Sequence, residues 1–420
     1  MFIRNMLPSR SDFLASLVVF IIAVPLSLGI ALASGTSPAS GLIAAIIGGL
    51  IVGTASGVPF MVSGPAAGLT VLVFQIVQEY GLAGLALATA AAGIIQLVLG
   101  FLKLGWVFKL VPTGILNGML SAIGFIILVG QLHILAGAAV PASPINGVLT
   151  LPESFMQTFA SGPWAPVFWI GLFAIAVQVF WPKSWKEKIN LPPALPAVFF
   201  GTLFSLGFQM KRVEIGSLGN SVSDTFASLS SFQMDSITIG IIISALGLAL
   251  VASAESLLTA RAIDVLMPDH PASDLDRELK AQGLGNMASG FLGGLPITGV
   301  IVRSAANVQA GAETRKSAVY HGLWILLFLT LFTAILQSIP LTVLASVLIV
   351  TGIKLLNIPQ LITSLKTETQ QGLYWLITMV AIISTDLLMG LGIGMMIVAL
   401  VAVYQRVAVG KTNSTGNEAA

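Results

Sequence analysis

Apolar runs, most of them long enough to cross a lipid bilayer as a helix, alternate with short polar connections along the whole chain. A helix needs about 20 apolar residues to cross the hydrocarbon core, so each long run predicts a transmembrane span. The cadence of the first half, including a short third run, returns in the second half. We predict spans at residues 13–34, 38–56, 64–79, 82–102, 112–135, 164–181 and 193–210, and again at 236–260, 279–293, 299–313, 317–338, 341–356, 370–386 and 388–409.

An odd number of spans in each half requires the two halves to have opposite orientations in the membrane. The predicted fold is an all-α polytopic membrane protein with 14 transmembrane segments in a 7+7 inverted repeat. With the N-terminus in the cytoplasm, sixteen Lys and Arg residues lie on the cytoplasmic side, whereas Lys211 and Arg212 lie outside. Cytoplasmic loops are enriched in these residues, so the bias supports this orientation. Residues 141–159 and 211–235 are then predicted extracellular loops.

The third span of each half is short and broken. Pro296 disfavours helix for the residue before it, Thr298 is an acceptable N-cap, and Gly299 leaves the first helical amides uncovered. Ser63 is a good N-cap for the matching segment of the first half, and Pro65 fits a first helical turn. In opposite topologies the two half-helices enter from opposite sides, so their N-termini meet near the midplane. Such N-termini favour a negative solute, and matching broken helices indicate a transporter's binding site.

Composition excludes a soluble protein, because 56% of the 420 residues are hydrophobic and 9% are charged. A formal net charge of +2 suggests neither a nucleic-acid partner nor an acidic one. The expected surroundings are membrane lipid. The absence of cysteine excludes disulfides and thiol chemistry.

Two charged residues within predicted spans are candidates for ion binding. Arg303 lies about one turn inside the second half-helix, and helical side chains tilt back toward the N-terminus, so it can reach an anion there. Glu255 lies in the eighth span, where a carboxylate is costly and usually serves a cation or a proton. The two could instead neutralise one another. Thr259, one turn beyond Glu255, could add a hydroxyl ligand or bond within its own helix.

Nothing in the sequence indicates an enzyme. No P-loop, nucleophile elbow or metalloprotease motif is present, and the three histidines have no metal-like spacing. No cofactor is expected, apart from a possible sodium ion.

Five stretches carry a resemblance to a known family: Ala23–Ala31, Val62–Thr70, Glu278–Asn286, Gly293–Gly299 and Arg303–Val308. Through them the chain resembles the SulP family, also called solute carrier family 26, of inorganic anion transporters. The resemblance covers essentially the whole chain and is closest to the bacterial branch associated with bicarbonate. The C-terminal STAS domain usual in the family has no counterpart in this sequence.

The resemblance implies an elevator-like transporter that forms a homodimer and has core and gate domains. The implied divisions are a cytoplasmic N-terminus at 1–12, core domain at 13–104 and 236–338, gate domain at 105–235 and 339–409, and a cytoplasmic tail at 410–420.

The resemblance, combined with the half-helices, also assigns site residues. Glu255 and Thr259 match sodium ligands of the bicarbonate branch, where the acidic residue is Asp. Ile301 and Ala66 stand where that branch has Thr, and Arg303 resembles the arginine of many animal members. The expected substrate-binding residues are Ser63, Gly64, Ala66, Ala67, Thr298, Gly299, Val300 and Arg303, and the expected cation or proton residues are Glu255, Thr259, Gly299 and Ile301.

The expected function is secondary active transport of a small inorganic anion, with bicarbonate as the leading substrate, coupled to sodium or protons by an elevator mechanism. The expected location is a bacterial inner membrane. Alternatives on the same fold are a sulfate transporter, a chloride/bicarbonate exchanger and a channel-like anion conductor. An amide cradle with one arginine recognises charge better than identity, so the sequence leaves these open.

Overall fold

The computed structural model describes residues 9–109, 111–141, 143–160, 165–182, 193–212, 239–385 and 389–401, together with residues 223, 387 and 405. The predicted cytoplasmic tail at 410–420, most of the predicted N-terminal segment 1–12 and most of the predicted loop 211–235 lie outside the described residues.

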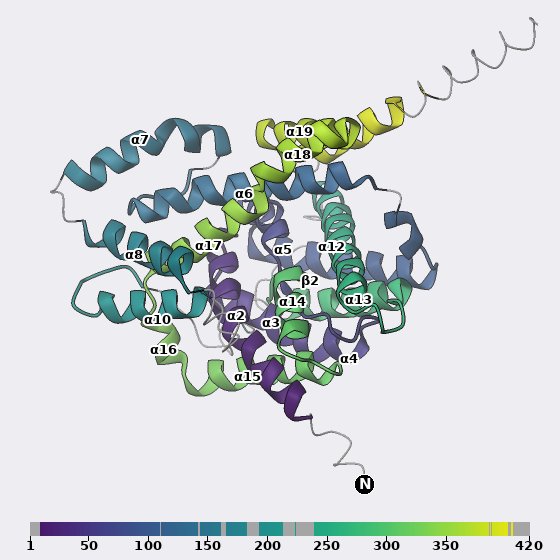
Figure 1. The fold of residues 1–420 in the computed structure, drawn as a ribbon, viewed down its shortest axis with the longest axis horizontal. Coiled ribbons are helices and arrows are strands. Elements are labelled where there is room, and N and C mark those ends of the chain that lie inside the picture. Colours follow the sequence, from purple (N-terminus) through teal and green to yellow (C-terminus); the bar gives the residue numbers. More distant parts are fainter. Residues whose placement is uncertain are drawn as a thin grey trace, which may run out of the picture.

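The described chain is mostly helical and contains one two-stranded sheet (Figure 1). Three short helical segments, η1 (Gly48–Val52), η2 (Ala67–Leu69) and η3 (Gly105–Lys109), connect longer ones. The other elements are α2 (Arg10–Ala33), α3 (Pro38–Ile47), α4 (Gly53–Ala55), β1 (Ser63–Pro65), α5 (Thr70–Phe101), α6 (Thr113–Leu135), α7 (Pro144–Ala160), α8 (Pro166–Phe180), α10 (Ala194–Ser205), α12 (Ile239–Leu266), α13 (Leu275–Phe291), β2 (Ile297–Gly299), α14 (Ile301–Gln309), α15 (Lys316–Leu331), α16 (Thr333–Gln337), α17 (Leu341–Leu356), α18 (Ile358–Thr367) and α19 (Thr369–Ser384).

Six of these helical stretches are long and apolar enough to cross a membrane, and four shorter apolar helices accompany them. A polytopic membrane fold is therefore confirmed. Most of the third predicted span and the fourth lie within α5, which consists of two helices that meet at a kink. The kink is at Gly81, where φ is 66° and ψ is −171°. The kink lies between the predicted spans 64–79 and 82–102. Its positive φ is a conformation that glycine adopts readily.

Two helices fall where the sequence predicted no span. α7 occupies most of the predicted loop 141–159, and α18 follows α17 after Asn357, whose φ of 42° is left-handed. The apolar residues Ile145, Val148 and Leu149 recur at helical spacing along α7 and are exposed. Gly147 and Pro152 within the same stretch make it look like a loop, because both residues disfavour helix.

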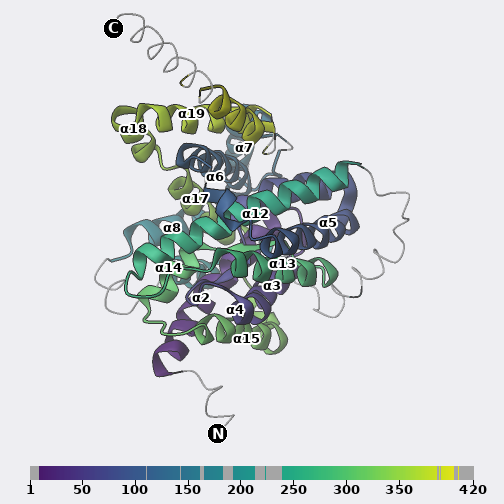
Figure 2. The ribbon, with the colours of Figure 1, turned by 90° about the vertical axis from the view of Figure 1, so that its right-hand side faces the viewer.

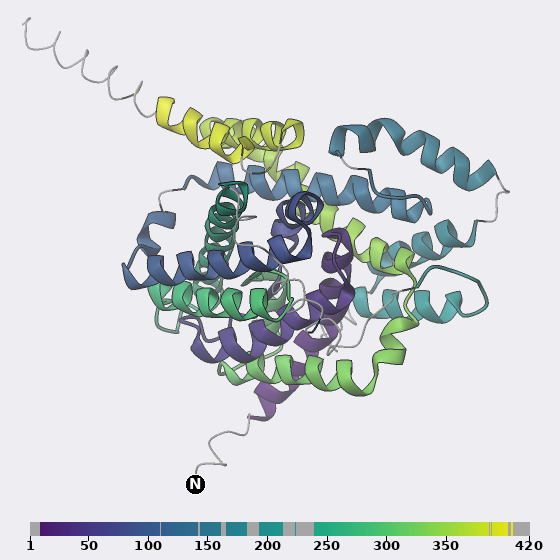
Figure 3. The same cartoon turned by 180° about the vertical axis from the view of Figure 1, so that it is seen from behind.

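Close contacts between small residues define two groups of helices. In the first group α5 lies against α13, and a Cβ atom on Gly283 would come within 2.6 Å of the Gly93 carbonyl oxygen. In the second group α6 lies against α17 and α19, and a Cβ atom on Gly124 would come within 2.7 Å of the Gly352 carbonyl oxygen. Figures 1 and 2 place α6, α18 and α19 at one end of the molecule and α3, α4 and α15 at the other. The view from behind has the same order (Figure 3).

We expect Gly283→Ala to lower the thermal unfolding midpoint of the purified protein in detergent by about 2–5 °C, because overpacking costs roughly 1–3 kcal/mol. The obstructing atom is a backbone oxygen of α5, so the helices have to separate. Gly392→Ala is the matched control, since a Cβ atom there meets nothing within 4 Å. Equal midpoints for the two variants would contradict the close α5–α13 packing.

Candidate anion site

Each broken segment contains a short strand before its helix, and the two strands pair as a sheet. Gly64 and Leu295 each precede a proline, which favours extended backbone at both positions. β1 pairs with β2 in antiparallel register, so that Ser63 lies opposite Gly299 and Pro65 opposite Ile297. Every residue of both strands is buried. Segments more than 230 residues apart in sequence therefore share hydrogen bonds inside the protein.

The helices after the strands begin without side-chain caps. Val300 is the N-cap of α14, and Ala66 precedes η2 and α5; neither has a side-chain hydrogen bond to the helix. The predictions that Ser63 and Thr298 are N-caps and that Pro65 lies in a first helical turn are therefore wrong. All three lie in strands, because pairing between the two halves extends the backbone past the residues that local sequence favours as caps. The first amides of both helices are left for another acceptor.

Buried polar side chains of neighbouring helices hold the two strands. Asn286 of α13 accepts from the Ile297 backbone N–H at 2.6 Å and donates to the Ile297 carbonyl at 3.0 Å. Ser256 of α12 accepts from the Gly299 N–H at 3.0 Å, and Thr259 donates to the Gly299 carbonyl at 2.9 Å. These contacts satisfy strand groups that would otherwise be unpaired at membrane depth. Neither Asn286 nor Ser256 was predicted as a site residue, although Asn286 ends one of the family-like stretches.

Arg303 is fully buried and reaches back across the start of its own helix to β1. Its Nη2 atom donates to the Ser27 hydroxyl of α2 at 3.1 Å and lies 3.5 Å from the Pro65 carbonyl oxygen. The Nε and Nη1 atoms are buried and have no hydrogen-bond partner among the residues that the structure describes. A Cβ atom on Gly64 would lie 2.4 Å from Nη1, so the glycine gives the guanidinium its place beside β1. The site thus holds a positive charge with two unused donors.

Glu255 of α12 lies against Gly68, just before the start of α5. A Cβ atom on Gly68 would lie 1.3 Å from Oε1 of Glu255, so only glycine fits there. The Thr298 hydroxyl donates a hydrogen bond to the carboxylate, whereas Oε2 is buried without a partner. Glu255 and Arg303 form no ion pair, so their mutual neutralisation is not observed among the described contacts.

The remaining predicted residues surround these groups. Ala66 is buried and Ala67 partly buried at the start of η2, and the Val300 backbone N–H donates to the Val62 carbonyl at 3.0 Å. Ile301 is 40% exposed and brings no polar side-chain atom to the cation side.

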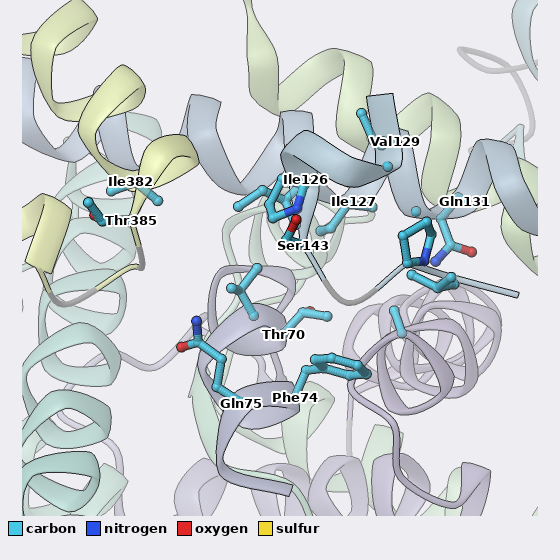
Figure 4. A pocket seen from close by; sticks show the side chains of 17 residues that line it. Thr70, Phe74, Gln75, Ile126, Ile127, Val129, Gln131, Ser143, Ile382 and Thr385 are labelled. Carbon is cyan, nitrogen blue, oxygen red and sulfur yellow. The ribbon is translucent and has the colours of Figure 1, made fainter. Parts of the chain in front are cut away.

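A cavity of about 90 Å³ opens beside the first turn of α5. Thr70 lies at its edge, buried, and the Thr70 hydroxyl has no hydrogen-bond partner. Figure 4 shows side chains of α5 facing those of α6 across this space. A cavity needs roughly 10–15 Å³ of such volume to admit one water molecule, so this space is large enough for water. Its lining includes Thr70, Phe74, Gln75, Ile126, Ile127 and Gln131.

Comparisons with known proteins agree with this architecture. A model of the sulfate permease family matches residues 10–378. The YvdB protein of Bacillus subtilis, which carries a provisional name as a sulfate transporter, is 28% identical over 397 residues, covering 94% of this chain and 73% of YvdB. The bicarbonate transporter BicA of Picosynechococcus is 26% identical, covering 92% of this chain and 69% of BicA.

Solved structures give the same relationship. The transmembrane domain of a cyanobacterial bicarbonate transporter BicA superposes with a TM-score of 0.81 at 26% identity, covering 91% of this chain and 97% of that domain. A family model over most of the chain, a matching fold and the paired broken segments lead to one conclusion. The chain belongs to the sulfate permease (SulP, or solute carrier 26) family of membrane anion transporters.

Proposed function

We propose that this protein transports bicarbonate, held between the starts of α5 and α14 beside β1 and β2. The observation that carries the proposal is the unsatisfied guanidinium of Arg303 next to two helix starts that lack side-chain caps. Helix N-termini attract anions, and a planar guanidinium fork matches the two oxygens of a carboxylate-like group. Relatives named as bicarbonate transporters support this choice of substrate.

Sulfate is the second candidate, favoured by the same Arg303 geometry. The buried charge of Arg303 can compensate the charge of an anion without a bound cation. Transport without a cation is compatible with sulfate or with exchange of an anion such as chloride. The named sulfate transporter among the relatives supports this alternative.

Glu255 is the proposed coupling group, taking sodium or a proton. Its Oε2 atom has no partner, and Thr259 and the Gly299 carbonyl lie within the same hydrogen-bonded cluster. Carboxylate, hydroxyl and carbonyl oxygens are the ligands that hard cations prefer. Because Thr259 and Ser256 both bond to Gly299, a cation there would stiffen β2 and with it the anion site.

An elevator movement is proposed for a homodimer in the inner membrane, with both termini cytoplasmic and 14 spans in two inverted repeats. The α5–α13 group, with α2, α3, α12, α14 and α15, corresponds to the core at 13–104 and 236–338. The group around α6 and α17 corresponds to the gate at 105–235 and 339–409. The support is the packing, since glycine contacts join helices within each group. The cavity beside Thr70 lies between α5 of the first group and α6 of the second.

We expect Arg303→Lys to raise the KM for labelled bicarbonate and labelled sulfate about 10- to 100-fold in proteoliposomes. Lysine keeps the charge but loses the fork, and hydrogen bonds to charged groups are worth about 1.5–3 kcal/mol. Arg315→Lys is the control, since Arg315 bonds instead to the Thr54 carbonyl. An unchanged KM in Arg303→Lys would show that this guanidinium does not bind the anion.

Glu255→Gln should abolish the stimulation of uptake by an inward sodium or proton gradient, whichever drives the unmodified protein. The amide cannot carry a negative charge or release a proton, so uptake should fall to the rate measured without an ion gradient. Initial rates with and without each gradient measure this. The exposed Glu79, replaced by Gln, serves as the control. Full gradient stimulation in Glu255→Gln would assign coupling to another group.

A further inference from the structure

A buried carboxyl group lies beside the residues that lead into β1. Glu278, in the first turn of α13, is fully buried. Its Oε2 atom accepts hydrogen bonds from the Ser56 hydroxyl at 2.5 Å and the Gly57 N–H at 3.0 Å. Its Oε1 atom accepts from Nε2 of Gln282 at 2.7 Å. Each of these hydrogen bonds to the carboxyl group of Glu278 comes from a donor.

Gln282 passes the effect of this carboxylate to β1. The same Nε2 atom donates to the Ser63 hydroxyl oxygen at 2.8 Å. A carboxylate only accepts hydrogen bonds, so the amide must present its NH₂ group to Glu278, and the second hydrogen of that group points to Ser63. The Oε1 atom of Gln282 is buried and has no partner among the described residues. The orientation of the Gln282 amide is therefore not set by a hydrogen bond to that oxygen. Glu278 selects it.

The Ser63 hydroxyl can act as a hydrogen-bond donor. Because its oxygen accepts from Gln282, its proton is free to donate, and no acceptor for it is found among the described residues. Ser63 is the first residue of β1, opposite Gly299, beside Gly64 and the Arg303 guanidinium. The charged oxygens of bicarbonate and of sulfate only accept hydrogen bonds, so a hydroxyl that faces them favours binding when it donates.

We propose that Glu278 is a positioning residue that acts through Gln282 to fix the Ser63 hydroxyl as a hydrogen-bond donor to the transported anion. This inference rests on the anion site proposed above and adds a determinant of its affinity that does not touch the substrate. A neutral amide at position 278 removes the selection. Gln282 can then turn its oxygen toward Ser63 and take the proton that the anion needs.

The test is uptake of labelled bicarbonate and labelled sulfate by proteoliposomes of the full chain. Glu278→Gln should raise the KM roughly 10-fold with a nearly unchanged maximal rate, about as much as Ser63→Ala, since one hydrogen bond to a charged partner is lost. Gln282→Met removes the competing oxygen and should raise the KM only about threefold. The double variant Glu278→Gln/Gln282→Met should return to that threefold value, so the second substitution rescues the first.

A purely structural role predicts the opposite order, with the double variant worse than either single one. Thr89→Val is the matched control for a buried polar residue, because the Thr89 hydroxyl is fully buried without a partner on α5. Absence of rescue overturns the inference. So does an unchanged KM in Ser63→Ala when Arg303→Lys raises it, and that result leaves the proposed anion site standing. An unmodified protein that accumulates neither anion overturns the proposed function itself.

Discussion

The pairing of β1 with β2 is the constraint on which the rest of the site depends. Extended backbone inside a bilayer is stable only when its N–H and C=O groups are bonded within the protein. Each strand supplies part of what the other needs, and Asn286, Ser256 and Thr259 supply more. Since each strand leads directly into a helix, this one pairing sets where both helices begin relative to each other. Two helix starts from opposite halves of the chain are thereby held at one place.

The two charged groups of the site contact different residues and form no ion pair with one another in the described part of the chain. Arg303 lies against Gly64 and bonds to Ser27, whereas Glu255 lies against Gly68 and bonds to Thr298. Had they paired with one another, each would have satisfied the other, and a solute would have to break that pair. Each group instead retains a buried atom without a partner. Burying such groups without partners is costly, and in the proposed function bound ions offset that cost.

The helices approach one another closely at small residues. Lipid surrounds apolar side chains as favourably as protein does, so association of membrane helices depends on close packing instead. Gly93 and Gly283 join α5 to α13, and Gly124 and Gly352 join α6 to α17. This packing holds α13, which also carries Glu278, Gln282 and Asn286, against α5. Rigid support matters here, because a hydroxyl or amide displaced by an ångström no longer bonds to its partner.

The sequence by itself determined the membrane class, most of the helices, the two broken segments and the two charged side chains, Arg303 and Glu255. These follow from the chain's own hydrophobic pattern and from the high cost of charge at membrane depth. Local rules misplaced the caps at Ser63 and Thr298, because those residues pair with a distant segment. They missed α7, because Gly147 and Pro152 within it disfavour helix. The register of β1 on β2, the place of Gly64 beside Arg303 and the chain from Glu278 to Ser63 were decided by tertiary structure alone. Each joins residues more than 200 positions apart, and no local preference specifies which of many distant partners a buried polar group will meet.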